Sequence, residues 1–217
     1  MVHKNKLSIG FFFISITIGI IFTYIISRPN IEAGAEIDTI QKSVADKIIR
    51  FHVIANSDSK EDQALKLKVK EAVVDYTSEL LKNSSDIAET EILLNSNMDE
   101  IRNIATDVVK KNGYDYPVTT IITDAYFPTK SYGNYTFPPG TYRAFEIKIG
   151  NAEGRNWWCV LYPPLCFVDI SHGVVDSQSD KMMQETLTTD EYDAITGAGN
   201  TKIKFRFRYL NFLNDLW

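Results

Sequence analysis

Residues 48–76, IIRFHVIANSDSKEDQALKLKVKEAVVDY, decide the fold of this chain. In the first part, Ile49, Phe51 and Val53 alternate with other side chains at the period of two that a β-strand requires. From Leu65 onwards, apolar residues recur every three or four positions, which is the spacing of one face of an amphipathic helix. The stretch therefore predicts a buried strand, a turn and a long helix with one face in the core.

The turn between the predicted strand and helix is unusually polar. Residues 56–59, NSDS, offer four consecutive side chains that can accept hydrogen bonds from free backbone amides at a helix start. Ser59 with Asp62, or Asp58 with Glu61, has the spacing of a capping box. Capping explains part of this polarity, and contact with a partner is the other interpretation.

Length and composition indicate an ordinary globular protein. The chain has 217 residues, of which 44% are hydrophobic and 24% charged, and a core of this size needs no metal or oligomer for its stability. The formal net charge is -5. Since an acidic protein repels polyanions, this charge disfavours nucleic acid and anionic lipid as partners.

The N-terminus predicts export from the cytoplasm. A basic segment, residues 3–6, precedes an uncharged run at residues 7–26 that is long enough to span a bilayer as a helix. This order places the N-terminus in the cytoplasm and the rest of the chain outside. Residues 1–35 are either an uncleaved anchor or a signal peptide removed after Ala35, and residues 36–47 form a connector. The hydrophobic helix is the expected contact with a membrane in the uncleaved case.

Two cysteines, Cys159 and Cys166, flank a segment in which Pro163 and Pro164 can turn the chain back on itself. In an oxidising compartment, a disulfide that closes this small loop is the leading interpretation. Two buried free thiols are the alternative. Metal ligation is disfavoured because the C-x6-C spacing is not a usual zinc pattern.

The remaining periodicities predict an α+β fold. Helical spacing resumes at residues 87–108, and strand patterns follow at 116–124, 142–149 and 156–161. We expect a mainly antiparallel sheet with two or three helices packed on one face, preceded by the N-terminal hydrophobic helix. The predicted body spans residues 48–170.

Residues 171–217 are expected to form a C-terminal extension. A polar loop leads to a short helix at 189–195, opened by a capping box of Thr188 and Glu191. The chain then reaches KIKFRFRY at 202–209, where aromatic and basic residues alternate as in an edge strand.

Catalytic motifs are missing from the sequence. It contains no H-E-x-x-H, no G-x-S-x-G and no glycine-rich phosphate loop, so we predict no catalytic residue, metal or cofactor. Ser57 and Lys60 match S-x-x-K, and His52 with Asp58 is a possible general-base pair without an evident nucleophile. An exported cell-wall or peptide hydrolase that uses either pair is the alternative function.

Several stretches are richer in polar or aromatic residues than capping and core packing require. They are the turn at 56–62, the aromatic loop at 126–135 and the segment at 157–166. Because aromatic side chains anchor protein interfaces, these stretches are candidate partner surfaces, although the aromatics can also pack under their own loop. The candidate residues are Asn56, Asp58, Asp62, Tyr126, Tyr132, Trp157, Trp158, Pro163 and Pro164.

The order of several long motifs resembles one protein family. IRFHVIANSDSKEDQALKLKVKEAVVDY, KKNGYDYPV, FPTKSYG, PPGTYRAFEIKIG and NWWCVLYPPLCFVD follow one another as in the stage II sporulation protein R family, over residues 48–169. The resemblance implies a signalling protein of endospore-forming bacteria that crosses the forespore membrane into the space between forespore and mother cell. It further implies that the partner is a membrane-embedded aspartic protease, stage II sporulation protein GA, which cleaves the sigma-E precursor. The family implies no catalytic residues.

Overall fold

The computed structural model describes residues 17, 31–166, 175 and 177–197 of the chain. Apart from Thr17, the predicted hydrophobic helix lies outside the described residues, as does the predicted strand at 202–209. Among the helices that are described, none is long and apolar enough to cross a membrane. The boundaries predicted at residues 35 and 170 therefore stay predictions.

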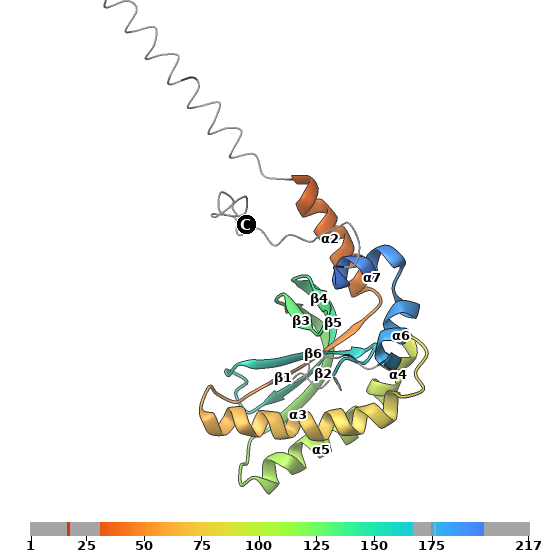
Figure 1. Ribbon diagram of the computed structural model, residues 1–217. Helices are drawn as coiled ribbons and strands as arrows, with labels where there is room; N and C mark the ends of the chain where they lie inside the picture. The colour runs from red at the N-terminus through yellow and green to blue at the C-terminus, as the bar shows by residue number, and fades with distance from the viewer. Residues whose placement is uncertain (1–16, 18–30, 167–174, 176, 198–217) are drawn as a thin grey trace, which may run out of the picture. The chain divides into compact units, whose positions relative to one another are not determined.

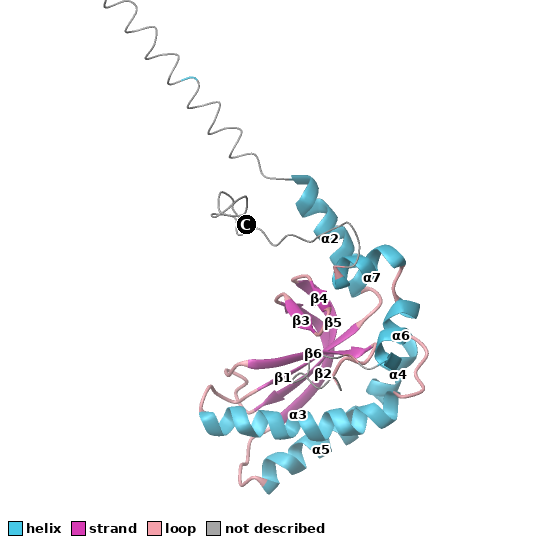
Figure 2. Ribbon diagram, in the orientation of Figure 1, coloured by secondary structure: helices cyan, strands magenta, loops and turns pink. Residues whose placement is uncertain are grey.

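The chain divides into two compact units, Met1–Asp38 and Thr39–Trp217. The described part of the first unit is Thr17 and the opening of helix α2. Figure 2 shows the helices and strands, and the second unit contains both kinds. The described helices are α2 (Ile31–Ala45), α3 (Lys60–Leu81), α4 (Ile87–Ser96), α5 (Met98–Lys111), α6 (Ser177–Thr186) and α7 (Thr189–Thr196). The strands are β1 (Ile49–Ile54), β2 (Val118–Phe127), β3 (Lys130–Tyr132), β4 (Tyr135–Phe137), β5 (Gly140–Ile149) and β6 (Asn156–Tyr162).

The predicted α+β class is confirmed, but the expectation of a mainly antiparallel sheet is wrong. The four-stranded sheet has the order β2-β5-β1-β6, with β1 parallel to β5 and antiparallel to β6. β5 and β6 are joined by a short turn and run in opposite directions. Because β1 lies between them, it must be parallel to one of the two. The sheet is therefore mixed because β1 pairs with two distant strands, and the periodicity of a strand does not show which strands it will pair with.

Helices cover one face of the sheet, and in Figure 1 α3 and α5 lie along one side of it. On this helix-covered face, Phe51 of β1 stacks on Phe145 of β5 with ring centroids 5.7 Å apart. Val69 and Val73 of α3 are fully buried in the same core. The amphipathic helix predicted from residue 65 onwards is thus confirmed as the element that closes this core.

The opposite face of the sheet carries the small hairpin β3–β4, which forms a separate two-stranded sheet. α7 contacts β4, and its predicted capping box of Thr188 and Glu191 is present. α6 was not predicted from the sequence. Of its ten residues, SQSDKMMQET, only Ser179 and Met183 are buried, so the sequence shows too little apolar repetition to predict a helix.

Candidate functional site

The polar turn before α3 is organised around the carboxylate of Asp62. This side chain is buried and accepts hydrogen bonds from Ser57 Oγ at 2.6 Å and Asn56 Nδ2 at 2.8 Å. Burial works against ionisation, but the hydrogen bonds that the carboxylate accepts outweigh it and lower the pKa of Asp62. Ser59 is the N-cap, since its hydroxyl accepts the Asp62 N–H at 3.1 Å. Half of the capping box predicted at Ser59 and Asp62 is present, because the Ser59 N–H donates to Ser57 Oγ and not to the Asp62 carboxylate.

A second turn, residues 150–155 between β5 and β6, is bound to the first. Asn56 Oδ1 accepts the Asn151 N–H at 2.9 Å, and Asp58 Oδ1 accepts the Arg155 N–H at 2.7 Å. The backbones approach so closely that a Cβ at Gly154 would lie 2.2 Å from the carbonyl oxygen of Ser57. The polarity of residues 56–62 thus serves to join two turns.

Among the three candidate contact residues of this turn, exposure differs. The Asp62 side chain is buried and that of Asn56 is partly covered, whereas Asp58 is exposed. Asp58 Oδ1 also lies 3.3 Å from Nε of Arg155, an exposed ion pair. The role of this turn in binding stays a prediction, and Asp58 is the residue that a partner can reach.

The pairs proposed for a hydrolase are not assembled in the described part of the chain. The Ser57 hydroxyl donates a hydrogen bond to Asp62, and the exposed Lys60 amine forms no hydrogen bond or ion pair within the described part of the chain. His52 lies against Glu146, not Asp58, with Nε2 2.7 Å from Oε2. Neither arrangement places a base beside a free nucleophile.

His52 and Glu146 belong to a buried polar group on the face opposite the helices. The hydrogen bond from His52 lowers the pKa of Glu146 to about 2 against the opposing effect of burial, with a further contribution from Lys148. Trp158 stacks on the imidazole with ring centroids 4.9 Å apart, and Phe127 lies beside both rings. Aromatic rings therefore shield the contact between His52 and Glu146 from water.

Arg50 is the functional candidate that sequence reasoning missed. Its side chain is fully buried, and the guanidinium carbon lies 4.4–5.8 Å from the centroids of four aromatic rings. These rings belong to Phe127, Tyr132, Phe137 and Tyr142. Strand alternation alone placed Arg50 on the face opposite Phe51. The available signal was a charged residue inside a mostly apolar strand.

The polar contacts of Arg50 are incomplete. Nε donates to the carbonyl of Cys159 at 3.2 Å, and Nη2 donates to the Tyr132 hydroxyl at 3.3 Å. Nη1 has no hydrogen-bond partner among the described residues, and none of their ion pairs includes Arg50. Burial lowers the pKa of Arg50, although the two neighbouring tyrosines oppose this effect. An arginine stays charged even so, which leaves a buried cation without a carboxylate from the described chain.

The aromatic candidates occupy different environments. Tyr126 is 66% exposed, whereas Tyr132 is buried against Arg50. Trp157 and Trp158 lie on opposite faces of β6, as alternation predicts: Trp157 contacts Phe51, and Trp158 contacts His52. Both tryptophans are half-buried. Tyr126 is thus the aromatic side chain that is freely available for contact.

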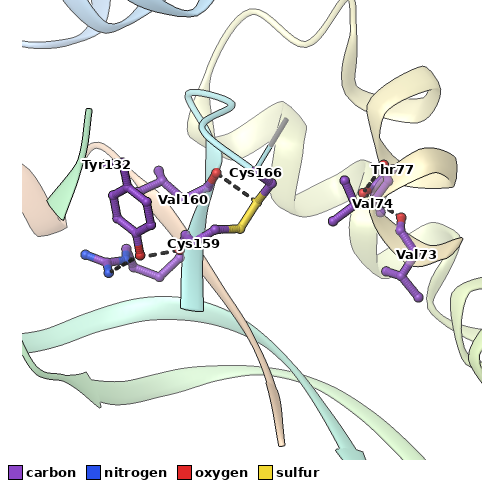
Figure 3. The surroundings of a disulfide bond; sticks show 8 residues. Val73, Val74, Thr77, Tyr132, Cys159, Val160 and Cys166 are labelled. Atoms are coloured by element: carbon purple, nitrogen blue, oxygen red, sulfur yellow. Dashed lines mark hydrogen bonds between the residues drawn. A yellow bond between two sulfur atoms is a disulfide. The ribbon is translucent and has the colours of Figure 1, made fainter. Parts of the chain in front are cut away.

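The predicted disulfide between Cys159 and Cys166 is present, with Cα atoms 5.3 Å apart. Figure 3 shows it facing the part of α3 that carries Thr77. The loop folds back so that the Leu165 N–H donates to the Val160 carbonyl at 2.9 Å. Pro163 is buried and Pro164 is partly covered, and Pro164 lines a small cavity of about 180 Å³.

Within the described residues, no group of three or more His, Cys, Asp or Glu side chains is placed to hold a metal ion. The candidate site has three parts. They are the two joined turns at residues 56–62 and 150–155, the exposed side chain of Tyr126, and the buried polar residues Arg50, His52 and Glu146 under aromatic rings.

Comparisons with known proteins agree on one family. The family model described as Stage II sporulation protein R (spore_II_R) matches residues 45–172. Stage II sporulation protein R of Bacillus subtilis (strain 168) is 36% identical over 183 residues, which cover 81% of this chain and 82% of that protein. No solved structure matches. The family description names a sporulation protein and not an enzyme class. The chain belongs to the stage II sporulation protein R family.

Proposed function

We propose that this protein is an exported signal of endospore formation that activates a membrane-embedded aspartic protease, stage II sporulation protein GA. The activated protease then cleaves the sigma-E precursor in the mother cell. The observation that carries the proposal is the family membership, with the likeness to the Bacillus subtilis protein extending over 81% of this chain.

Two features of the molecule support export across the forespore membrane. The basic residues 3–6 followed by the uncharged run at 7–26 have the order of an export signal. The disulfide between Cys159 and Cys166 is typical of proteins that leave the reducing cytoplasm. The protein then acts in the space between forespore and mother cell, either anchored or released after Ala35.

Activation requires no chemistry from the activator itself. A ligand shifts a protease from its inactive to its active arrangement only if it binds the active arrangement more tightly. A stable surface with a few exposed anchors is sufficient for this task. Asp58 and Tyr126 are the exposed members of the predicted contact set and suit that role.

The decisive experiment places this protein, the protease and the sigma-E precursor together in a non-sporulating host. We expect precursor cleavage when all three are present and little cleavage when this protein is omitted. Equal cleavage without it would overturn the activator function. Loss of cleavage on expression without residues 1–35 would indicate that export is required.

A matched pair of variants examines the exposed surface in the same assay. Tyr126 and Ile92 are large apolar side chains with similar exposed fractions, 66% and 64%. We expect Tyr126→Ala to reduce cleavage about tenfold, because an exposed aromatic anchor contributes more than 1 kcal/mol to an interface. Ile92→Ala on α4 should leave cleavage unchanged. An equal effect of the two variants would remove Tyr126 from the contact surface.

The intact mass of the exported protein determines the state of its leader and its cysteines. A mature chain that begins at residue 36 would show cleavage after Ala35. Treatment with a reductant should increase the mass by two hydrogen atoms if Cys159 and Cys166 are joined. An unchanged mass would contradict the disulfide in the exported protein.

A further inference from the structure

The buried guanidinium of Arg50 has an unmet requirement. Removing a charge from water is costly unless hydrogen bonds and an opposite charge compensate for it. Arg50 has a carbonyl, a hydroxyl and four aromatic rings as neighbours, but Nη1 has no hydrogen-bond partner in the described part of the chain. The missing group is an acceptor, and a carboxylate satisfies an arginine best because it offers charge and planar geometry together.

The hairpin β3–β4 supplies part of the cover over this cation. Tyr132 of β3 and Phe137 of β4 are two of the four rings around Arg50. The other two rings, from Phe127 and Tyr142, belong to the main sheet. The hairpin pairs only with itself, through three residue pairs, and a hairpin of this size has little stability of its own. Contacts outside the hairpin must therefore keep it in place.

One such contact is a hydrogen bond from the hairpin to α6. The Tyr135 hydroxyl donates to Oδ1 of Asp180, which also accepts the Tyr192 hydroxyl of α7 at 2.8 Å. Gln184 Nε2 donates to the other carboxylate oxygen at 2.9 Å. Tyr135 itself is fully buried. We call the Tyr135–Asp180 hydrogen bond the latch, because it joins the cover of Arg50 to the C-terminal helices.

We propose that Arg50 is a concealed carboxylate-binding residue, reached by an acidic side chain of the protease when the hairpin β3–β4 moves away from it. This inference rests on the proposed function, since it names the contact through which the protease is engaged. In the free protein the latch favours the closed hairpin. Binding then combines two events: the hairpin opens, and the carboxylate pairs with a cation that has no other counter-ion among the described residues.

The chemistry of the surroundings favours a single carboxylate over a polyanion. Four aromatic rings surround the buried guanidinium, whereas a phosphate backbone needs an open basic surface. The net charge of -5 also repels nucleic acid and anionic lipid. A glutamate or aspartate on a protein partner meets both conditions.

If the latch holds the hairpin closed, deleting this hydrogen bond should strengthen binding to the protease. Tyr135→Phe removes the bond between the hairpin and Asp180 and so raises the population of the open hairpin. Tyr192→Phe is the matched control, since it deletes a hydroxyl from the same carboxylate but keeps the latch and the ring contact between residues 135 and 192. The measurement is the amount of this protein that co-purifies with the protease from solubilised membranes of the coexpression host. We expect severalfold more with Tyr135→Phe, up to about tenfold for one hydrogen bond to a carboxylate, and no change with Tyr192→Phe.

Arg50→Lys tests the cation in the same assay. Lysine keeps the charge but lacks the guanidinium nitrogens, so we expect co-purification to fall at least tenfold. In the double variant, the gain from Tyr135→Phe should disappear, because the open hairpin then exposes no guanidinium. Circular dichroism of the purified variants reports whether they fold. If Arg50→Lys does not fold, the contrast between Tyr135→Phe and Tyr192→Phe decides the question.

The outcomes separate this inference from the proposed function. If the wild-type protein neither co-purifies with the protease nor supports cleavage, the proposed function is wrong and the inference with it. If the wild type supports cleavage while folded Arg50→Lys binds equally well, Arg50 is no contact and the activator function stands. A Tyr135→Phe variant that binds no better than Tyr192→Phe overturns the latch.

Discussion

Two polar regions of this molecule differ in how fully their polar groups are hydrogen-bonded within the fold. The turn at residues 56–62 is the most polar stretch of the body, yet its buried carboxylate accepts several hydrogen bonds and its backbone is joined to a second turn. The strand β1 is largely apolar, yet it carries Arg50, a buried cation whose Nη1 has no partner among the described residues. Polarity in the sequence therefore does not indicate where polar groups remain available.

The difference has a physical cause. Residues in a turn are close in sequence, so Asn56 and Ser57 reach Asp62 with little loss of chain entropy. A strand residue has no such local partners and depends on whatever the tertiary fold brings to it. For Arg50 the fold brings aromatic rings, and for His52 it brings Glu146. The polar groups of the turn thus bind other parts of the fold, whereas Arg50 on the strand has a nitrogen to which a partner can offer a hydrogen-bond acceptor.

Asp62→Ala should have the largest effect on stability. The substitution removes the buried carboxylate and leaves the partly buried donors of Asn56 and Ser57 without an acceptor, so we expect a loss of about 4 kcal/mol in the free energy of unfolding. Urea unfolding of the purified protein measures it. Glu61→Ala, an exposed neighbour in the same helical turn, is the control and should change little. A loss below about 1 kcal/mol for Asp62→Ala would mean that the joint does not depend on this carboxylate.

The ionisation of Glu146 should make the free energy of unfolding depend on pH in the acidic range. Its pKa in the folded protein is about 2, below the ordinary value of 4.5, so its contribution is fully present above pH 4.5 and is lost as the pH falls towards 2. The shift corresponds to about 3 kcal/mol. Wild type should thus exceed Glu146→Gln by that amount at pH 6 and approach it near pH 2, as measured by unfolding across this range. A difference that does not vary with pH would show that the fold does not stabilise the ionised form of Glu146.

Gly154→Ala should weaken the joint between the two turns by about 2 kcal/mol, because the new Cβ would overlap the Ser57 carbonyl oxygen. Gly113→Ala is the comparison. Gly113 has a positive φ of 84° but no atom within 4 Å of the added Cβ, so that variant should lose only about 1 kcal/mol from backbone strain. Thermal unfolding ranks the two. The reverse order would contradict the close approach of the turns.

Asp58→Ala should have the smallest effect on stability, about 0.5 kcal/mol, because its ion pair with Arg155 and the hydrogen bond that it accepts from the Arg155 N–H are both exposed to water. The same variant is informative in the coexpression assay. A severalfold loss of precursor cleavage at unchanged stability would show that the turn contacts the protease. Unchanged cleavage would leave the turn a structural joint alone, and Asp58→Asn shows whether charge or hydrogen bonding matters.

Much of the local structure was predictable, since it depends on neighbours in sequence. The strand before residue 55, the long helix after residue 60, the cap at Ser59 and the capping box at Thr188 all follow from short-range spacing. The Cys159–Cys166 disulfide was the leading interpretation for the same reason, as its loop is short. α6 escaped prediction because few of its side chains face the core.

The sequence by itself determined the class of fold, its main elements and, through long motifs, the family. Only the tertiary structure decided that β1 lies between β5 and β6, which makes the sheet mixed. That same placement brings Arg50 under four aromatic rings and His52 against Glu146, residues up to 94 positions apart along the chain. Periodicity records which side of a strand a residue occupies, but pairing between distant segments decides what it meets there.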